Sequence, residues 1–270
     1  MKPKKLIKQS KGRVLISFIM PILDPTKDIL TRLKELEKTL IDDLDMQNNF
    51  EFLIIFSISK KYLFDKSIFK ILKKTNFIIK EVPREGIYSA YNAGVSFAKG
   101  CYLNFLGSDD KLNCNKKVWS KVKDILSRKT PILLITQVLP FSIIKKKIYN
   151  VKNKIQKMPP DLPLYHQGIF YKKELFNNNI FDTKLSIAAD YLHFLNLCKR
   201  INNTKEFKFF SGVTHEFCLD GFSSHPKNRI KLMKDIFIAR YKSGFGFKFF
   251  HYKFFIKSIM RYLLFIFFKK

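Results

Sequence analysis

Residues 84–112 constrain the fold more than any other segment of this chain. Apolar residues recur at helical spacing over residues 87–99, which predicts a helix. Gly100 follows, and because glycine readily takes the left-handed conformation that ends a helix, we expect it at the C′ position. The apolar run 101–106 predicts a buried strand, and the Ser-Asp-Asp of residues 108–110 comes where that strand ends. A helix leading into a strand with carboxylates at its C-terminal end is typical of open α/β sheets that bind ligands there.

The two adjacent carboxylates, Asp109 and Asp110, therefore lie at the expected ligand-binding edge of the sheet. Carboxylate oxygens are the ligands that hard divalent cations such as Mg²⁺ or Mn²⁺ prefer. Asp pairs also end strands in ordinary surface turns, so a turn without a ligand is the alternative. For the pair taken alone, the turn is the favoured reading.

Strands and helices alternate through the rest of the first half, as an α/β sheet requires. Residues 14–20 read as a buried strand, and Asp24 followed by Pro25 reads as an N-cap and the first position of a helix. Leu30, Leu33, Leu36 and Leu40 share one face of that helix. Further strands are expected at residues 50–56, 77–82 and 132–138, and further helices at residues 62–74 and 116–127.

The second half has a different character. Residues 141–151 predict a hairpin with a lysine-rich turn, and residues 158–163 a proline-rich loop. Helices are expected at residues 188–200 and 228–241, and a strand at residues 207–218. We expect a ligand-binding half, about residues 12–140, and a second half, about residues 141–244, within one domain of residues 1–244.

The composition is strongly basic, with 51 Lys+Arg against 22 Asp+Glu and a formal net charge of +29. Such a charge predicts attraction to polyanions: nucleic acid, an anionic membrane surface or phosphorylated substrates. The four cysteines have no metal-ligand spacing, so free thiols in a reducing compartment are expected. No apolar run reaches the ~18 residues of a transmembrane helix, and the basic start lacks a signal-peptide cleavage site.

The tail, residues 245–270, is a separate segment. Lys253, Lys257 and Arg261 recur every four residues and share one helical face, with many aromatic and aliphatic side chains around them. This pattern is typical of a basic amphipathic helix in a membrane interface. A helix packed on the protein's own core is the alternative.

Residues 84–112 resemble the family 2 glycosyltransferases of the GT-A fold, in particular the colanic-acid-type branch that builds bacterial surface polysaccharides. The matching residues are Gly86, Ile87, Tyr88, Ala90, Asn92, Gly94, Ala98, Gly100, Tyr102, Phe105, Leu106 and Asp110. The resemblance implies a metal-dependent inverting transferase that moves a sugar from a nucleotide-diphosphate donor to a lipid-linked or cell-surface glycan. It also implies a mostly parallel mixed sheet flanked by helices, in a cytoplasmic protein peripheral to the inner face of the cell membrane.

The resemblance also assigns roles. It favours a metal site over a plain turn and implies a metal-binding DxD-type motif at residues 108–110, with Asp110 as the ligand and Asp109 beside it. It also implies a general base at Asp190, for which a helix N-terminal Asp is the alternative reading. His166 and Gln167 fall where the family binds its acceptor, although a lone histidine is often structural, and residues 220–223 resemble a loop that closes over the site. The expected nucleotide-sugar contacts are Pro21, Asp24, Arg84, Gly86, Tyr88, Asn92, Ser108 and Asp109.

Three departures from the family pattern leave other functions open. The second strand ends in residues 56–59, Phe-Ser-Ile-Ser, where the family carries an acidic motif, and Arg84 and Ser89 replace two acidic residues. A catalytically inactive homologue that acts as a partner subunit is therefore the alternative. A basic nucleic-acid-binding protein is a third reading, but no helix-turn-helix, RNP or zinc signature is visible, so no nucleic-acid partner is expected.

Overall fold

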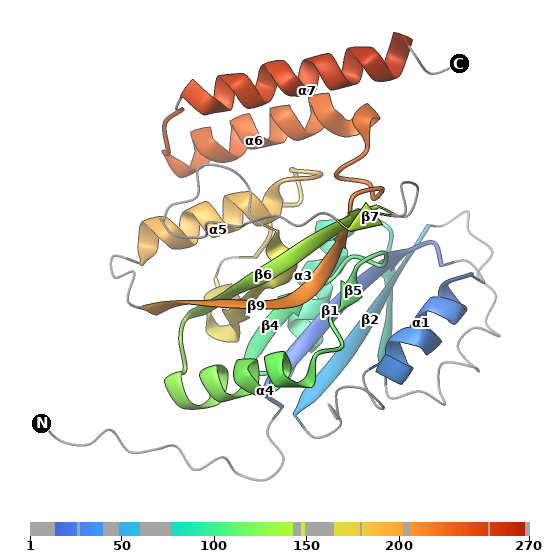
Figure 1. The fold of residues 1–270 in the computed structure, drawn as a ribbon, viewed down its shortest axis with the longest axis vertical. Coiled ribbons are helices and arrows are strands. Elements are labelled where there is room, and N and C mark those ends of the chain that lie inside the picture. Colours follow the sequence, from blue (N-terminus) through green and yellow to red (C-terminus); the bar gives the residue numbers. More distant parts are fainter. Residues whose placement is uncertain are drawn as a thin grey trace, which may run out of the picture.

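The computed structural model describes residues 14–25, 28–39, 49–59, 77–142, 147–148, 165–178, 180–201, 206–247 and 249–267. A mixed β-sheet crosses the molecule with helices on both faces, and three helices are stacked above one end (Figure 1). The strands are β1 (Ile16–Leu23), β2 (Phe50–Ile58), β3 (Phe77–Pro83), β4 (Tyr102–Phe105), β5 (Lys111–Leu112), β6 (Leu133–Ser142), β7 (Lys147–Ile148), β8 (Ile169–Lys172) and β9 (Phe207–Cys218). The helices are α1 (Asp28–Lys38), α3 (Ile87–Phe97), α4 (Lys116–Asp124), α5 (Ala189–Arg200), α6 (Arg229–Ser243) and α7 (Phe249–Phe267).

The sheet order is β3-β2-β1-β4-β8-β6-β9-β5, with β7 paired to β6. Strands β3, β2, β1 and β4 run parallel, so their C-terminal ends meet at one edge. Strand β8 is antiparallel to both β4 and β6, while β6 and β9 pair in parallel. The four parallel strands therefore form the ligand-binding edge of an α/β sheet. The other strands on the sheet path, β8, β6, β9 and β5, continue the sheet from β4.

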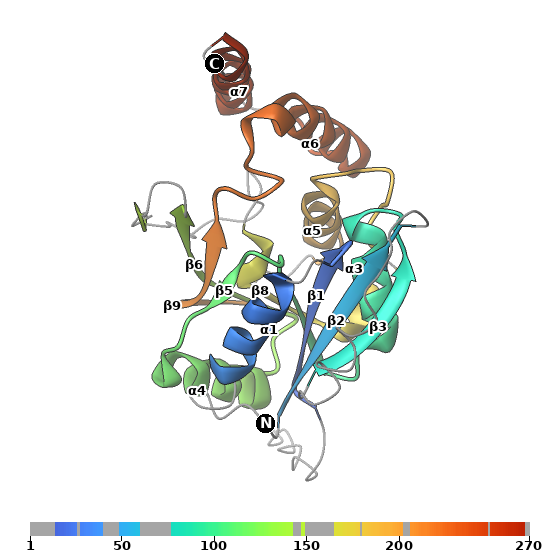
Figure 2. The same ribbon diagram turned by 90° about the vertical axis from the view of Figure 1, so that its right-hand side faces the viewer.

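Helices lie on both faces of the sheet (Figure 2). A hydrophobic cluster packs against each face. Neighbouring residues of β1 point to opposite faces: Ile19 packs with Leu53 in the cluster that includes α3 and α5, and Phe18 packs with Trp119 of α4 in the other. Strands covered on both faces read as continuous apolar runs, which explains why β1 and β2 were recognisable in the sequence. The predicted strands and helices are confirmed where the structure describes them, apart from the start of the first helix. The predicted helix 62–74, the turn of the predicted hairpin 141–151 and the predicted loop 158–163 lie outside the described residues.

Gly100 has a different role from the one predicted. Helix α3 ends at Phe97, and among the described glycines only Gly86 and Gly244 have positive φ. A Cβ on Gly100 would lie 2.5 Å from the backbone nitrogen of Ser17 in β1. The position needs glycine because two backbones approach closely, and the prediction of a left-handed helix end was wrong.

Asp24 does not cap a helix, because α1 begins at Asp28. Its carboxylate accepts a hydrogen bond of 2.8 Å from the backbone N–H of Ser59 and forms an ion pair with Arg84. Asp24 has a positive φ of 41°. The N-cap prediction was therefore wrong, and Asp24 instead connects the C-terminal ends of β1, β2 and β3.

The tail forms helix α7, which lies against α6 on the side away from the sheet (Figure 1). Its inner face buries His251 and Ser258. Phe254 packs against the hydrophobic cluster that includes α3 and α5, called the main core cluster below. Its outer face exposes apolar side chains, namely Ile256, Ile259, Met260, Leu263, Leu264, Ile266 and Phe267. Within the described residues, no helix has the length and apolar content needed to cross a bilayer. The inner face of the tail thus packs on the protein, as the alternative reading expected, and contact of the exposed outer face with a membrane stays a prediction.

Candidate active site

A cavity of about 540 Å³ lies beside the C-terminal end of β4 and extends to helices α6 and α7. Asp109 lines it from the turn after β4, and Asp190 lines it from the first turn of α5. Tyr88 of α3 and the short 3₁₀ helix His166–Gly168 contribute the wall between the two carboxylates. The structure thus brings together in one cavity Asp109, the predicted base and the predicted acceptor residues, whereas the predicted metal ligand Asp110 is not in the cavity lining.

The two carboxylates of the Asp-Asp pair have different environments. Asp110 is 4% exposed, and its carboxylate accepts hydrogen bonds from Gln167 Nε2 at 2.9 Å, from the backbone N–H of Gly107 at 2.7 Å and from that of Cys218 at 3.3 Å. Burial raises the pKa of Asp110, the adjacent Asp109 raises it further, and the hydrogen bonds from Gln167 and Gly107 oppose the rise. Asp110 therefore fixes the turn from within the protein.

Asp109 is the carboxylate of the pair that lines the cavity. Its oxygens lie against two glycines: a Cβ on Gly221 would be 2.4 Å from Asp109 Oδ2, and a Cβ on Gly107 would be 2.9 Å from Oδ1. The described residues contain no group of three or more His, Cys, Asp and Glu side chains that could hold a metal by themselves. A cation shared with a diphosphate needs only one or two carboxylates, and Asp109 fits that requirement.

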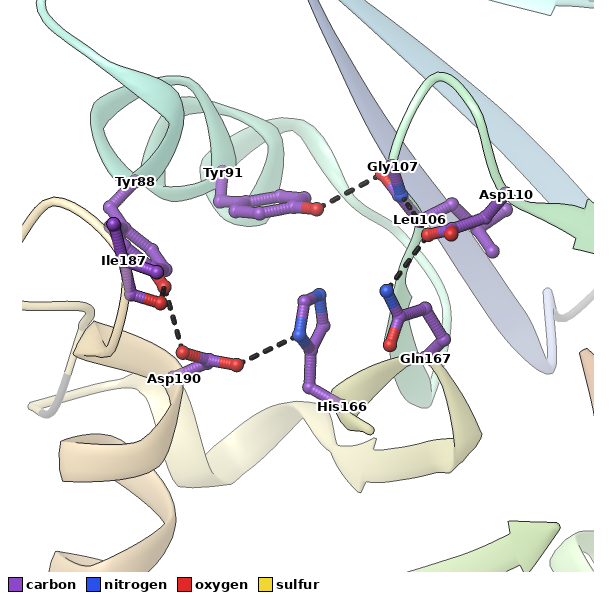
Figure 3. Close-up of polar contacts among 9 residues, drawn as sticks. All are labelled: Tyr88, Tyr91, Leu106, Gly107, Asp110, His166, Gln167, Ile187 and Asp190. Atoms are coloured by element: carbon purple, nitrogen blue, oxygen red, sulfur yellow. Dashed lines mark hydrogen bonds and ion pairs between the residues drawn. The ribbon is translucent and has the colours of Figure 1, made fainter. Parts of the chain in front are cut away.

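Asp190 is held in place by two side chains (Figure 3). The Tyr88 hydroxyl lies 2.7 Å from Asp190 Oδ1 and 2.6 Å from the carbonyl oxygen of Ile187, so it can donate to either. His166 Nδ1 lies 2.8 Å from Asp190 Oδ2. Burial and the charge of Asp190 raise the pKa of Tyr88 well above its usual value, so the hydroxyl stays a donor.

The His166–Asp190 pair has mutually shifted pKa values. Burial favours the neutral carboxyl, but the charge and hydrogen bond of His166, together with the Tyr88 hydroxyl, hold the pKa of Asp190 below its usual value. Burial likewise disfavours the imidazolium, while Asp190 and then Asp110 raise the pKa of His166 above its usual value. Asp190 therefore favours the ionised state, in which a carboxylate can accept a proton.

The segment before α5 is positioned by two polar anchors. Buried Asp235 of α6 accepts hydrogen bonds of 2.7 Å from the backbone N–H groups of both Ser186 and Ile187. Asn92 exchanges two hydrogen bonds with the backbone of Phe181, at 2.9 and 3.0 Å. Asn92 was expected to contact the donor. Its amide group instead binds the backbone of the segment that leads to Asp190.

A buried polar network supports the floor of the cavity. Asn104 of β4 donates to the carbonyl oxygens of Gln167 and Ile169 at 2.7 and 3.1 Å. His215 Nε2 lies 3.1 Å from Asn104 Oδ1, and its Nδ1 lies 2.7 Å from the Thr214 hydroxyl. Burial lowers the pKa of His215 to about 3, so the ring is neutral inside the network. The network ties β4 and β9 to the turn that carries His166.

The remaining expected donor contacts gather at the ends of β1 to β4. Pro21 is buried in β1, and Gly86 precedes α3 with a φ of 106°. Ser108 accepts a hydrogen bond on its carbonyl oxygen from Arg32 of α1, which also donates to the carbonyl oxygen of Asp110. Asp24 and Arg84 lie at the same edge as an ion pair. These residues are outside the lining of the cavity.

Two arginines of the cavity wall were not singled out as site residues. Arg229 is the first residue of α6, and Arg261 lies near the end of α7. Arg229 had no motif to mark it. Arg261 was grouped with Lys253 and Lys257 by its spacing, and nothing in that spacing shows that the helix turns Arg261 toward a cavity.

No family model matches the sequence. Chondroitin synthase of Pasteurella multocida (strain Pm70) is 30% identical over 165 residues, which is 60% of this chain. Hyaluronan synthase of Pasteurella multocida is 29% identical over 153 residues, or 55% of this chain. The chain spans only 17% and 15% of the lengths of these two relatives.

Solved structures resemble the whole fold. S. aureus TarS 1–349 in complex with UDP-GlcNAc superposes with a TM-score of 0.58 at 14% identity, covering 94% of this chain and 73% of that one. Mannosyltransferase PcManGT from Pyrobaculum calidifontis, in complex with GDP-Man and Mn²⁺, gives a TM-score of 0.56 at 12% identity, with 92% and 69% covered. The predicted fold class is confirmed: the chain has the mixed α/β architecture of GT-A glycosyltransferases.

Proposed function

We propose that this chain is an inverting glycosyltransferase that transfers a sugar from a nucleotide-diphosphate donor to a lipid-linked or cell-surface glycan. One observation carries the proposal: a partly buried Asp190, held by Tyr88 and His166, faces the same cavity as Asp109, which follows the central strand β4. Direct displacement at a sugar carbon requires a base for the attacking hydroxyl and a group that holds the leaving diphosphate. Asp190 and Asp109 could supply these from one cavity. The GT-A fold and the two synthases that match part of the chain support this activity.

In the proposed reaction, the acceptor hydroxyl lies against Asp190 and attacks the anomeric carbon from the face opposite the leaving diphosphate. The hydroxyl proton passes to Asp190 as the new bond forms, and the nucleoside diphosphate departs with the electron pair of the broken bond, which inverts the configuration. Tyr88 and His166 hold the carboxylate in position for this transfer. Such a base typically contributes 10²- to 10⁴-fold in rate.

We propose that Mg²⁺ or Mn²⁺ is bound with the donor. When present, the cation neutralises the charge that develops on the diphosphate. Asp109 would hold it, because its carboxylate lines the cavity while that of Asp110 accepts three hydrogen bonds from the protein. The expectation that Asp110 is itself a ligand stays a prediction with less support.

The nucleoside is proposed to lie at the ends of β1 to β3. The second strand lacks the acidic motif of the resembling family, but Asp24 reaches across from β1 and binds the backbone of Ser59 just beyond β2. A carboxylate is therefore present near the end of β2, paired with Arg84. We propose that this pair contacts the ribose or base.

The division into a donor half, about residues 12–140, and an acceptor half, about residues 141–244, is part of the proposal. So are the colanic-acid-type branch and a cytoplasmic location on the inner face of the membrane. The basic charge and the apolar outer face of α7 support peripheral attachment to an anionic leaflet.

The test is nucleotide release from UDP-GlcNAc and from GDP-Man in the presence of Mn²⁺, with the full chain. Asp190→Asn should lower release by roughly 10²- to 10⁴-fold without changing the melting temperature by much. Asp182→Asn is the matched control, because Asp182 is a carboxylate paired with Lys242 outside the cavity. Release that Asp190→Asn leaves intact would overturn the assigned base, and a folded chain that binds no nucleotide would favour the inactive partner subunit.

A further inference from the structure

Helix α7 forms part of the cavity wall as well as part of the surface. Phe254 and Arg261, seven residues apart on the same side of the helix, both line the cavity that contains Asp190. Phe254 also packs against the main core cluster, which fixes the rotation of α7 about its axis. The basic tail therefore places one of its cations at the cavity mouth.

A second cation faces the same space. Arg229 is partly buried in the cavity wall, and its Nη2 donates to the carbonyl oxygen of Ser224 at 3.0 Å. Its Nε is buried and has no hydrogen-bond partner among the described residues. Burial lowers the pKa of Arg229, and the nearby charge of Arg261 lowers it further. Two guanidinium groups that line one cavity, one of them with an unused buried donor, form an arrangement that an anion would stabilise.

The helix that carries Arg229 adds to the positive potential. Arg229 is the first residue of α6, where the helix dipole favours negative charge, and the first turn of α6 contains no acidic residue. No ion pair joins Arg229 or Arg261 to a carboxylate among the described residues. The two guanidinium groups are therefore without a directly paired carboxylate within the part of the chain that the structure describes.

The wall around the two arginines is apolar. Ile187, Leu232, Ile236 and Phe254 line it, and the open apolar face of α7 begins beside it. A sugar diphosphate alone would leave this surface without a partner. A ligand that combines a phosphate with a hydrocarbon chain would satisfy both the guanidinium groups and the apolar wall.

We propose that Arg229 and Arg261 form a phosphate subsite for the acceptor, and that the acceptor phosphate is carried on a hydrocarbon chain lying along α6 and α7. The inference rests on the proposed function, because Asp190 marks the acceptor end of the cavity. The donor diphosphate is expected instead at the Asp109 end, next to β4. Arg261 thus couples the tail to substrate recognition, and its role is distinct from that of the exposed Lys257 one turn earlier.

The experiment is isothermal titration of the full chain with farnesyl phosphate, with uncharged farnesol and with UDP or GDP plus Mn²⁺. The variants are Arg261→Gln and Arg229→Gln, with Lys257→Gln as a control that removes the same charge from α7 outside the cavity. We expect farnesyl phosphate to bind the wild type at least tenfold more tightly than farnesol. Arg261→Gln and Arg229→Gln should each weaken farnesyl phosphate about tenfold and leave farnesol and nucleotide binding unchanged, and Lys257→Gln should change none of them.

Each other outcome has a defined meaning. Weaker nucleotide binding with unchanged farnesyl phosphate binding in Arg261→Gln would assign the arginines to the donor and overturn the subsite. An equal loss in Lys257→Gln, or no loss in any variant, would overturn it too. If wild type binds no nucleotide but shows the predicted loss of farnesyl phosphate, the subsite stands and the proposed transferase function fails. Arg261 is exposed at the cavity mouth, so its variant tests the inference even where Arg229→Gln fails to fold.

Discussion

The carboxylate of Asp190 depends on two neighbours for its low pKa, and each can be removed with little change of shape. Tyr88→Phe deletes a hydroxyl that lowers the pKa of Asp190. We expect the acid limb of the pH profile of kcat/KM to move to higher pH, because a carboxylate with fewer hydrogen-bond donors is protonated more easily. The measurement is the nucleotide-release rate between pH 4 and pH 9.

Tyr91→Phe is the matched control, since Tyr91 lies on the same helix and also lines the cavity. Its hydroxyl donates to the carbonyl oxygen of Leu106 at 3.0 Å and does not bond to Asp190 (Figure 3). The acid limb should stay where it is in wild type. A shift of equal size in Tyr91→Phe would show that Tyr88 does not act through Asp190.

The sequence identified several residues of the cavity, but it did not show which groups each of them contacts. Asp109, His166, Gln167 and Asp190 were named from short motifs, and all four line one cavity. The sequence favoured Asp110 over Asp109 as the metal ligand, but of the two only Asp109 lines the cavity, because a turn sends neighbouring side chains in directions that the sequence does not encode. The distinction becomes visible only when strands and loops from distant segments bring Gln167 and Cys218 to Asp110.

At the level of elements, the turn after β9 keeps Asp109 in place. A methyl group on Gly221 would lie 2.4 Å from Asp109 Oδ2, whereas Gly246 has open space around it. Gly221→Ala should displace the carboxylate and weaken Mn²⁺-dependent nucleotide binding by roughly tenfold, about 1.4 kcal/mol. Gly246→Ala should bind as wild type does. Equal binding by all three proteins in a calorimetric titration would show that Asp109 does not depend on this turn.

Helix α5 contains a buried histidine that should make the fold sensitive to acid. His193 is 2% exposed and stacks on Phe176 with ring centroids 4.4 Å apart, and burial lowers its pKa to about 3. The unfolded chain binds a proton there below about pH 6.5, so this contribution to stability is present above that pH and is lost as the pH falls toward 3. At pH 5 the loss is roughly 2 kcal/mol.

His193→Phe places a similar ring in the same aromatic surroundings and cannot be protonated. The free energy of unfolding of this variant should fall by about 2 kcal/mol less than that of wild type between pH 8 and pH 5. Urea unfolding at the two pH values measures the difference. An unchanged pH dependence would contradict a neutral, buried His193.

At the level of the whole molecule, the apolar face of α7 should attach the protein to membranes. Leu264 and Phe267 are exposed by 53% and 74%. Replacing both by Gln removes apolar surface without touching the inner face of the helix, so sedimentation with anionic vesicles should fall several-fold. Ile180→Gln is the control, because Ile180 is 57% exposed outside the tail. Equal sedimentation of the double variant and wild type would contradict this attachment.

The fold class could be predicted because the buried strands and helices have recognisable apolar patterns in the sequence. Strands β1 and β2 and helices α3 and α5 carry continuous or periodic apolar patterns that local sequence reveals, so the α/β class could be predicted. The role of Gly100 and the cavity wall built by Arg229 and Arg261 could not, since each depends on which distant segments become neighbours. For the same reason the tail read as a separate unit although Phe254 packs on the core.

The most direct test of the proposed transferase is calorimetric titration of the full chain with UDP and with GDP, each with and without Mn²⁺. We predict that one nucleotide binds in a Mn²⁺-dependent manner and that Asp109→Asn weakens it at least tenfold. Asp110→Asn should instead lower the free energy of unfolding by roughly 1–3 kcal/mol, because one of the two acceptor oxygens becomes an NH₂ group that faces a buried hydrogen-bond donor. A folded wild type that binds neither nucleotide, or Mn²⁺-dependent binding that survives in Asp109→Asn, would contradict the account.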